Sequence, residues 1–143
     1  VLCAVAALLA GCVTNKPAAE APKVVVDGKQ LEERDGLRYF EDKLFTGVTV
    51  RKFPDGQKFG ELTYKDGKQH GLSTMWNDNG QKSAESTWKD GKLHGLWTKW
   101  WYNGQKMKEW TYKDGKFISY QGWNRDGTPS RFDKDGKLIR EIP

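Results

Sequence analysis

The sequence is poor in the residues from which a thick hydrophobic core is built. Only 36% of its 143 residues are hydrophobic, and 30% are charged. Cysteine occurs twice, at Cys3 and Cys12, so the chain beyond residue 12 has no disulfide, no cysteine nucleophile and no cysteine-based metal site. The net charge of +5 is modest and both signs are interspersed, which does not predict a nucleic-acid-binding surface.

Aromatic residues and glycine are, by contrast, abundant. The chain has 7 Trp, 5 Tyr, 6 Phe and 16 Gly. Disordered segments have few aromatic residues because they bury little apolar surface. Wide, flat side chains separated by turn-forming glycines therefore predict thin β-sheets rather than a globular core.

The N-terminal residues have the features of an export signal. Residues 1–10 form an apolar run that is too short for a bilayer span of roughly 20 residues but suits the hydrophobic region of a signal peptide. Leu9-Ala10-Gly11-Cys12 resembles the lipobox of bacterial lipoproteins, in which the cysteine thiol receives a diacylglycerol. We therefore expect residues 1–12 to be a lipoprotein signal peptide with a lipidated Cys12. The alternative is a buried hydrophobic helix that carries an ordinary cysteine.

A lipidated Cys12 would make the membrane of the cell envelope a partner of the protein. Val13 stands where many Gram-negative lipoproteins carry the aspartate that retains them in the inner membrane. This favours the outer membrane, on its periplasmic side or at the surface, if the source is Gram-negative. Residues 13–30 are rich in proline and alanine, and we expect them to form a flexible tether.

The rest of the chain repeats itself with a period of 24 residues. Lys65-Asp66-Gly67-Lys68 recurs at residues 89–92 and 113–116, and Asn79-Gly80-Gln81-Lys82 recurs at residues 103–106. Between these turn signals lie runs that alternate polar and apolar residues, as β-strands do. We predict an all-β repeat domain over residues 31–143: an elongated antiparallel sheet of consecutive β-hairpins, a single-layer meander. Its copies run over about 41–64, 65–88, 89–112 and 113–133, with a C-terminal cap over 134–143.

Pro54 predicts the type of turn. Proline cannot adopt the positive φ that a two-residue type I′ turn requires. Pro54-Asp55-Gly56 instead suits a three-residue loop in which Gly56 is left-handed. If the later copies share this loop, Trp101 faces Gln105 and Trp100 faces Lys106.

Strict alternation from this register predicts which side chains share a face. The expected core face comprises Val48, Val50, Leu62, Tyr64, Leu72, Thr74, Trp76, Ala84, Trp88, Leu96, Thr98, Trp100, Trp110 and Tyr112. The expected solvated face comprises Thr49, Arg51, Glu61, Thr63, Glu85, Thr87, Lys99, Glu109 and Thr111.

At this point the sequence resembles a known family. Residues 95–116, with their Gly-Leu-Trp start, Asn-Gly-Gln-Lys centre and Lys-Asp-Gly-Lys end, are similar to the MORN-repeat variant. The stretch from about 35 to 116 resembles YwqK-type MORN proteins, which are often labelled antitoxins. The resemblance implies an elongated, single-layer antiparallel sheet. It departs from the family pattern at Lys52, which replaces a core tryptophan, and at Ser119, which replaces the repeat glycine.

Two sets of polar residues recur with the period of the repeat. Glu61, Glu85 and Glu109 form a carboxylate ladder, but on an open sheet flanked by lysines nothing favours the protonated acid that glycoside hydrolysis needs. His70 and His94 occupy equivalent positions without a recurring third metal ligand, so we expect them to pack beside the repeat glycine. The sequence therefore predicts no catalytic residue, no metal site, no cofactor and no enzyme.

Six apolar side chains were expected on the solvated face, of which Trp97 and Trp101 flank Lys99. Exposed tryptophan beside lysine is typical of binding surfaces. The candidate binding patch comprises Trp97, Trp101, Lys99, Met107, Met75 and Phe53, while Phe59 completes the apolar set. The alternative is that these side chains pack against a neighbouring strand, the C-terminal segment or a partner chain. The function predicted is a non-catalytic envelope lipoprotein that binds or scaffolds a protein or glycan; the alternative is an antitoxin or immunity protein that neutralises an envelope-acting toxin.

Overall fold

The computed structural model describes residues 24–135 and 137, and every structural statement below concerns these residues. Cys12 and residues 13–23 of the predicted tether lie outside them. Residues 25–30, which the sequence assigned to the tether, form a short strand and a 3-10 turn. Val26 is 8% exposed in this segment because it packs with Phe45 and Tyr64.

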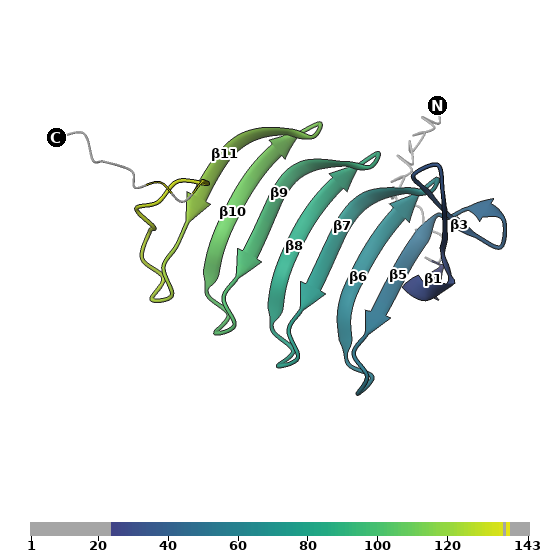
Figure 1. The fold of residues 1–143 in the computed structure, drawn as a ribbon, viewed down its shortest axis with the longest axis horizontal. Coiled ribbons are helices and arrows are strands. Elements are labelled where there is room, and N and C mark those ends of the chain that lie inside the picture. Colours follow the sequence, from purple (N-terminus) through teal and green to yellow (C-terminus); the bar gives the residue numbers. More distant parts are fainter. Residues whose placement is uncertain (1–23, 136, 138–143) are drawn as a thin grey trace, which may run out of the picture.

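The chain forms one long sheet and one short one (Figure 1). The eight-stranded sheet has the order β1-β5-β6-β7-β8-β9-β10-β11, so consecutive strands from β5 to β11 are neighbours. Its strands are β1 (Val25–Asp27), β5 (Gly47–Lys52), β6 (Lys58–Lys65), β7 (Lys68–Trp76), β8 (Lys82–Lys89), β9 (Lys92–Trp100), β10 (Lys106–Lys113) and β11 (Lys116–Gly122). Only β1 is parallel to its neighbour, β5. The prediction of an elongated sheet of consecutive hairpins is confirmed.

A smaller sheet lies at the N-terminal end of the array. Its strands are β2 (Glu32–Arg34), β3 (Leu37–Phe40) and β4 (Lys43–Leu44), preceded by the 3-10 turn η1 (Gly28–Gln30). Between this sheet and the first hairpins lies a small hydrophobic core, in which Phe45 is 3% exposed. The core consists of Val26, Phe45 and Tyr64, with Leu31, Phe40 and Leu62 packed against it. The sequence analysis did not predict this second sheet.

The turns at the two ends of the hairpins differ. At one end, Asp66 and Gly67 both have positive φ, of 49° and 77°, and so form the two-residue turn that Asp-Gly favours. At the other end, the Trp101 N–H donates to the Gln105 carbonyl at 2.8 Å, and Gly104 is left-handed with φ 83°. Trp100 pairs with Lys106. The register predicted from Pro54 is therefore confirmed at this loop.

The predicted faces, however, are wrong beyond the loop. Met107 is an extra residue: Lys106 lies opposite Trp100, but Lys108 lies opposite Lys99. This β-bulge shifts the pairing, and a shift of one residue exchanges the faces of a strand. Trp110 consequently pairs with Trp97, and not with the Leu96, Thr98 and Trp100 face.

The same bulge recurs in the two earlier hairpins, where the pairing shifts at Arg51/Lys52 and at Met75/Trp76. Each predicted face therefore mixed residues from both sides of the sheet. We call the first side the aromatic face: Leu62, Tyr64, Ser73, Met75, Ala84, Ser86, Trp88, Trp97, Lys99, Lys108, Trp110, Tyr112 and Tyr120. We call the opposite side the glutamate face: Lys58, Glu61, Thr63, Leu72, Thr74, Trp76, Lys82, Glu85, Thr87, Leu96, Thr98, Trp100, Lys106, Glu109 and Thr111.

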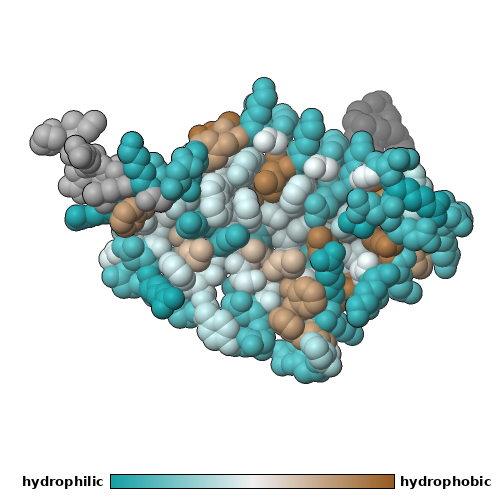
Figure 2. Space-filling model, in the orientation of Figure 1, coloured by the Kyte–Doolittle hydropathy of each residue, from teal (hydrophilic) through white to brown (hydrophobic). Residues whose placement is uncertain are grey.

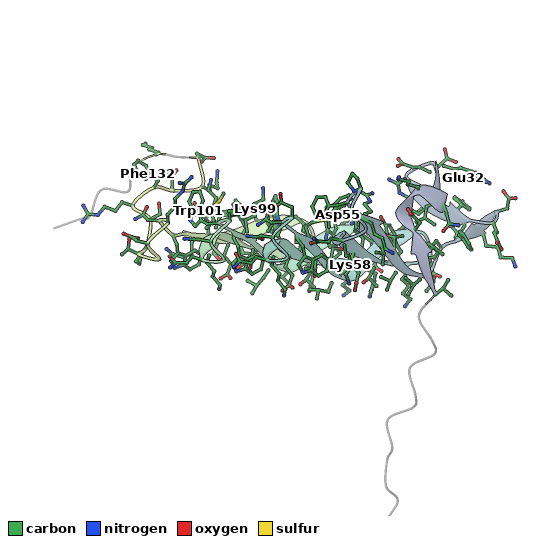
Figure 3. All side chains as sticks on the ribbon, turned by 90° about the horizontal axis from the view of Figure 1, so that it is seen from below. Glu32, Asp55, Lys58, Lys99, Trp101 and Phe132 are labelled. Atoms are coloured by element: carbon green, nitrogen blue, oxygen red, sulfur yellow. The ribbon has the colours of Figure 1, made fainter. Side chains whose placement is uncertain are left out.

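The two ends of the array rise above the aromatic face. In the side view, the strand that carries Glu32 and the segment that carries Phe132 project on the side of the sheet where Lys99 lies, whereas Lys58 lies on the other side (Figure 3). The C-terminal segment begins after β11, and the Ser130 N–H donates to the Gly122 carbonyl at 2.8 Å. The aromatic face is thus bounded at both ends. Among the described residues, no helix is long and apolar enough to cross a membrane.

Substitutions at Gly80 test whether the three-residue loops need a residue in the left-handed conformation. Its φ is +79°, and an added β-carbon would meet nothing within 4 Å, so the cost of a side chain comes from the backbone alone. We expect Gly80→Ala to lower the free energy of unfolding by about 1 kcal/mol, and Gly80→Asn by clearly less, because asparagine tolerates this conformation. Urea denaturation measures both values. Equal losses in the two variants would contradict the assignment.

Candidate functional site

The glutamate face carries a repeated set of paired charges. Glu61 and Glu109 accept hydrogen bonds from Lys58 and Lys106 at 2.6 and 2.8 Å, and Glu85 is paired with Lys82 in the same way. The Thr98 hydroxyl donates to the Glu109 carboxylate at 3.2 Å. Each carboxylate is therefore held by a lysine three residues before it. This arrangement pairs every carboxylate of the ladder with a cation, which suits a structural role.

The same lysines also cover tryptophan rings of the next copy. The ammonium groups of Lys58, Lys82 and Lys106 lie 4.7, 5.8 and 5.3 Å from the ring centroids of Trp76, Trp100 and Trp123. These cation–π contacts link each hairpin to its successor. One side of each ring is thereby occupied, so these tryptophans are less suited to stack on a ligand.

The two histidines complete the turns of the following copies. Nδ1 of His70 lies 3.3 Å from Oδ1 of Asp90, and Nδ1 of His94 lies 3.1 Å from Oδ1 of Asp114. Thr46 occupies the corresponding place in the first copy, where its hydroxyl accepts from the Asp66 N–H at 2.8 Å. The sequence analysis expected the histidines beside the repeat glycines and did not foresee their aspartate partners, because these lie 20 residues away. Among the described residues, no group of three His, Cys, Asp or Glu side chains is arranged to hold a metal ion.

The aromatic face carries a continuous row of rings over its C-terminal half. Trp97 stacks on Trp110 with ring centroids 4.6 Å apart, and Trp110 lies 5.7 Å from Tyr120. Burial raises the pKa of the Tyr120 hydroxyl, and the charge of Asp133 in the C-terminal segment raises it further. Figure 2 shows this face, with weakly polar to apolar surface, pale to brown, across the middle of the sheet and hydrophilic surface, teal, around it.

A groove lies beside this row. It lies over β7 and β8, has a volume of about 290 Å³, and is lined by Leu62, Gln69, Ser73, Met75, Ala84, Ser86, Trp88, Leu93, Trp97 and Lys99. Its floor consists of small residues, Ser73, Ala84 and Ser86, and the Ser86 hydroxyl accepts a 2.8 Å hydrogen bond from Nε1 of Trp88. The walls are mostly apolar.

The structure brings only part of the predicted patch together. Trp97, Lys99 and Met75 line the groove. Trp101 and Met107 lie at the end of the sheet against the C-terminal segment: Nε1 of Trp101 donates to the Trp123 carbonyl at 3.3 Å, and the Trp123 N–H donates to the Met107 carbonyl at 2.9 Å. The guanidinium carbon of Arg125 lies 5.1 Å from the centroid of the Trp101 ring.

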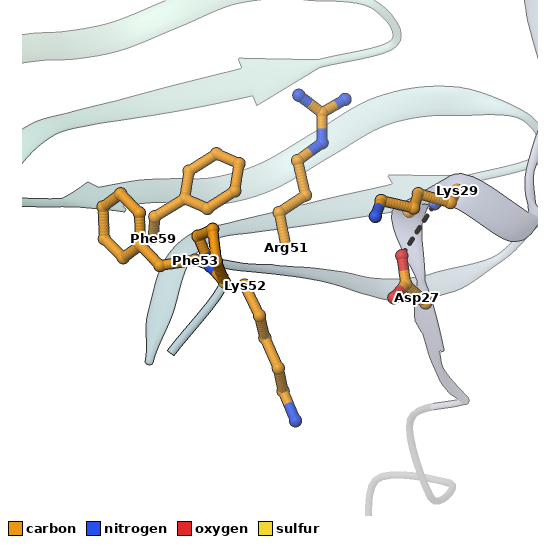
Figure 4. Close-up of a pocket in the computed structure, with 8 residues that line it drawn as sticks. Asp27, Lys29, Arg51, Lys52, Phe53 and Phe59 are labelled. Carbon is orange, nitrogen blue, oxygen red and sulfur yellow. Dashed lines mark hydrogen bonds between the residues drawn. The ribbon is translucent and has the colours of Figure 1, made fainter. Parts of the chain in front are cut away.

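Phe53 lies elsewhere, in a second pocket at the N-terminal end (Figure 4). Its ring centroid is 5.1 Å from that of Phe59, and the pocket has a volume of about 600 Å³. Asp27, Lys29, Arg51 and Lys52 contribute its charged side chains. Asp27 accepts a 2.9 Å hydrogen bond from the Lys29 N–H within the pocket wall.

Sequence reasoning missed the residues that the bulges bring to this face. Trp110, Trp88 and the serines of the groove had been placed elsewhere or not considered. The 24-residue comparison holds the signal that could have found the groove, because Ser73 and Ser86 stand where Trp97 and Trp110 stand one copy later. The position of the bulge is not visible in that comparison.

Comparison with known families supports the repeat. The model of the MORN repeat variant matches residues 69–90 and 93–114, which cover the hairpins β7–β8 and β9–β10. These two hairpins of the array are therefore similar to MORN repeats. Such repeats are generally non-catalytic binding modules. No curated protein and no solved structure matches the chain.

The stacked pair Trp97 and Trp110 is expected to stabilise the sheet as well as to shape the groove. Since both rings are half-buried, Trp97→Ala should lower the free energy of unfolding by about 2 kcal/mol, below the 3–5 kcal/mol of a fully buried ring. A double-mutant cycle with Trp110→Ala should give a coupling of about 0.5–1.5 kcal/mol. Additive losses in urea denaturation would show that the rings do not interact.

Proposed function

We propose that the protein is a non-catalytic, lipid-anchored binding module of the bacterial envelope that takes a protein or glycan ligand on its aromatic face. The observation that carries the proposal is the row of half-buried rings on a sheet that no second layer covers within the part of the chain that the structure describes. Aromatic surface of this kind, bordered by cations, is typical of contact surfaces. The MORN repeats support a binding role for the array.

The shape of the array also favours the aromatic face as the ligand-binding surface. The N-terminal sheet and the C-terminal segment rise at its two ends (Figure 3), so a ligand that lies along the aromatic face would meet side walls as well as a floor. On the opposite face the charges are already paired and the tryptophan rings are covered by lysines. The aromatic face is therefore the better contact surface of the two.

The envelope anchor rests on the lipobox-like Leu9-Ala10-Gly11-Cys12. Because the lipid is attached through the cysteine thiol, Cys12→Ser should leave the protein unlipidated and unprocessed. Metabolic labelling with a fatty acid, together with fractionation of the cells, measures this. Labelling of the serine variant at the level of the unchanged protein would contradict the proposal.

The binding face is tested by cross-linking the protein in its native envelope. Lys99→Glu reverses a charge on the aromatic face, and we expect it to reduce the amount of cross-linked protein or retained glycan roughly tenfold, which corresponds to about 1.4 kcal/mol. Lys92→Glu is the matched control, because it makes the same charge change at an exposed turn of the same strand. Equal retention by both variants and the unchanged protein would overturn the choice of face. A toxin as the captured partner would favour the antitoxin alternative.

A further inference from the structure

The groove on the aromatic face arises from a specific difference between two copies. Trp97 is paired with Trp110 and Lys99 lies beside Lys108 across the same two strands. One period earlier the paired residues are Ser73 with Ser86 and Met75 with Ala84. Two tryptophans and two lysines are thus replaced by two serines, a methionine and an alanine. The missing ring volume leaves the groove of about 290 Å³, which is at the lower end of the range for small-ligand pockets, about 300–1,000 Å³.

A polar atom without a partner lies at the floor of this groove. Ser73 is 8% exposed, and its hydroxyl oxygen is the one buried side-chain polar atom between residues 24 and 137 for which the structure shows no hydrogen bond. Burying a hydroxyl without a partner costs about 1–3 kcal/mol, so such groups are rare and call for a reason. This oxygen is closed to a ligand in the groove, so its burial is a cost of the small residues at the floor and not a ligand contact.

The charged side chain that lines the groove, among the described residues, is Lys99. Lys99 and Lys108 lie side by side on adjacent strands, where like charges destabilise a sheet. Neither forms an ion pair with a described residue, whereas the lysines of the glutamate face do. Nζ of Lys99 lies 5.1 Å from the ring centroid of Trp97. All three glutamates of β6, β8 and β10 lie on the opposite face, so the strands supply no carboxylate here.

The residues that line the groove favour a peptide over a sugar as its ligand. Leu62, Met75, Trp88, Leu93 and Trp97 make the walls apolar, and the Ser86 hydroxyl is already engaged by Trp88. A neutral sugar presents many hydroxyl groups that such walls would leave unsatisfied. It would also make no use of the two unpaired lysines. An apolar side chain fits the walls, and a neighbouring carboxylate fits the lysines.

We propose that this groove binds an acidic polypeptide segment, with one large apolar side chain between Met75, Trp88 and Trp97 and a carboxylate on Lys99 and Lys108. This inference rests on the proposed function, because it names the ligand of the same face. The attraction between the two lysines and the ligand carboxylate orients the segment in the groove. It also makes the association faster at low salt than at high salt. The apolar side chain gives most of the affinity, since it is the part removed from water.

The test uses the mature lipoprotein in detergent and a synthetic peptide of alternating glutamate and phenylalanine. Tryptophan fluorescence follows binding at low ionic strength. We expect binding of this peptide, at least tenfold weaker binding of the lysine/phenylalanine and glutamate/alanine peptides, and loss of affinity with added salt. Equal affinity for the lysine/phenylalanine peptide, or displacement of the acidic peptide by a neutral oligosaccharide of N-acetylglucosamine, would overturn the proposal.

Two double variants test the contribution of the groove and that of the lysine charges separately. The double variant Ser73→Trp, Ser86→Trp introduces the tryptophan pair of the next repeat and fills the groove. The double variant Lys99→Glu, Lys108→Glu reverses the charge and leaves the groove open. Each should weaken the acidic peptide at least tenfold, whereas Lys92→Glu should not. If the filled variant fails to fold, as its denaturation curve would show, the charge variant still decides. Undiminished affinity in the charge variant would contradict the inference.

The native-envelope cross-linking distinguishes a failure of this inference from a failure of the proposed function. If Lys99→Glu loses its native partner but no acidic peptide binds the unchanged protein, the face is right and the ligand chemistry is wrong. If Lys99→Glu keeps its native partner and no acidic peptide binds, both proposals are overturned.

Discussion

One extra residue in each hairpin determines what the two sides of this sheet present. Phe59, Ser83 and Met107 each enter the second strand of a hairpin just after its loop, and the pairing beyond them shifts by one position. Without that shift Trp110 would lie opposite Leu96, and Glu109 would lie opposite Trp97. With it, the rings gather on one side and the carboxylates on the other. The sorting of the sheet into an aromatic and a glutamate face is thus a consequence of the bulges more than of the alternating sequence.

The array is stabilised mainly by contacts between neighbouring strands of one sheet, and not by packing between two layers. Among the described residues, the packed core is a small one at the N-terminal end, around Phe45 and Tyr64. Elsewhere, the most buried side chains are short and polar: Thr74 and Thr98 are each 6% exposed, because longer neighbours on the glutamate face cover them. Their hydroxyl groups reach Glu85 and Glu109. A repeat protein of this kind is held by nearest-neighbour contacts, so its stability is close to a sum over adjacent hairpins.

The sequence was sufficient for the repeat, the turns and the fold class, because these depend on local signals. Asp-Gly and Pro-Asp-Gly determine backbone angles through steric limits that act within a few residues. The faces were not predictable from the same information, since a bulge has no residue signature as strong as a glycine turn. The groove required both: the serines at 73 and 86 are visible in the sequence, but only the shifted register makes them partners. For Trp101 the sequence left open a binding patch or packing against the C-terminal segment; the structure shows contacts with Trp123 and Arg125 of that segment.

The links between copies have a direction. The three Asp-Gly turns after β6, β8 and β10 are each completed by a side chain from the preceding copy: Thr46 contacts Asp66, His70 contacts Asp90 and His94 contacts Asp114. During synthesis the earlier partner always leaves the ribosome first. A new hairpin can therefore fasten its turn to a neighbour that is already in place, and no link has to wait for a residue that has not yet been made.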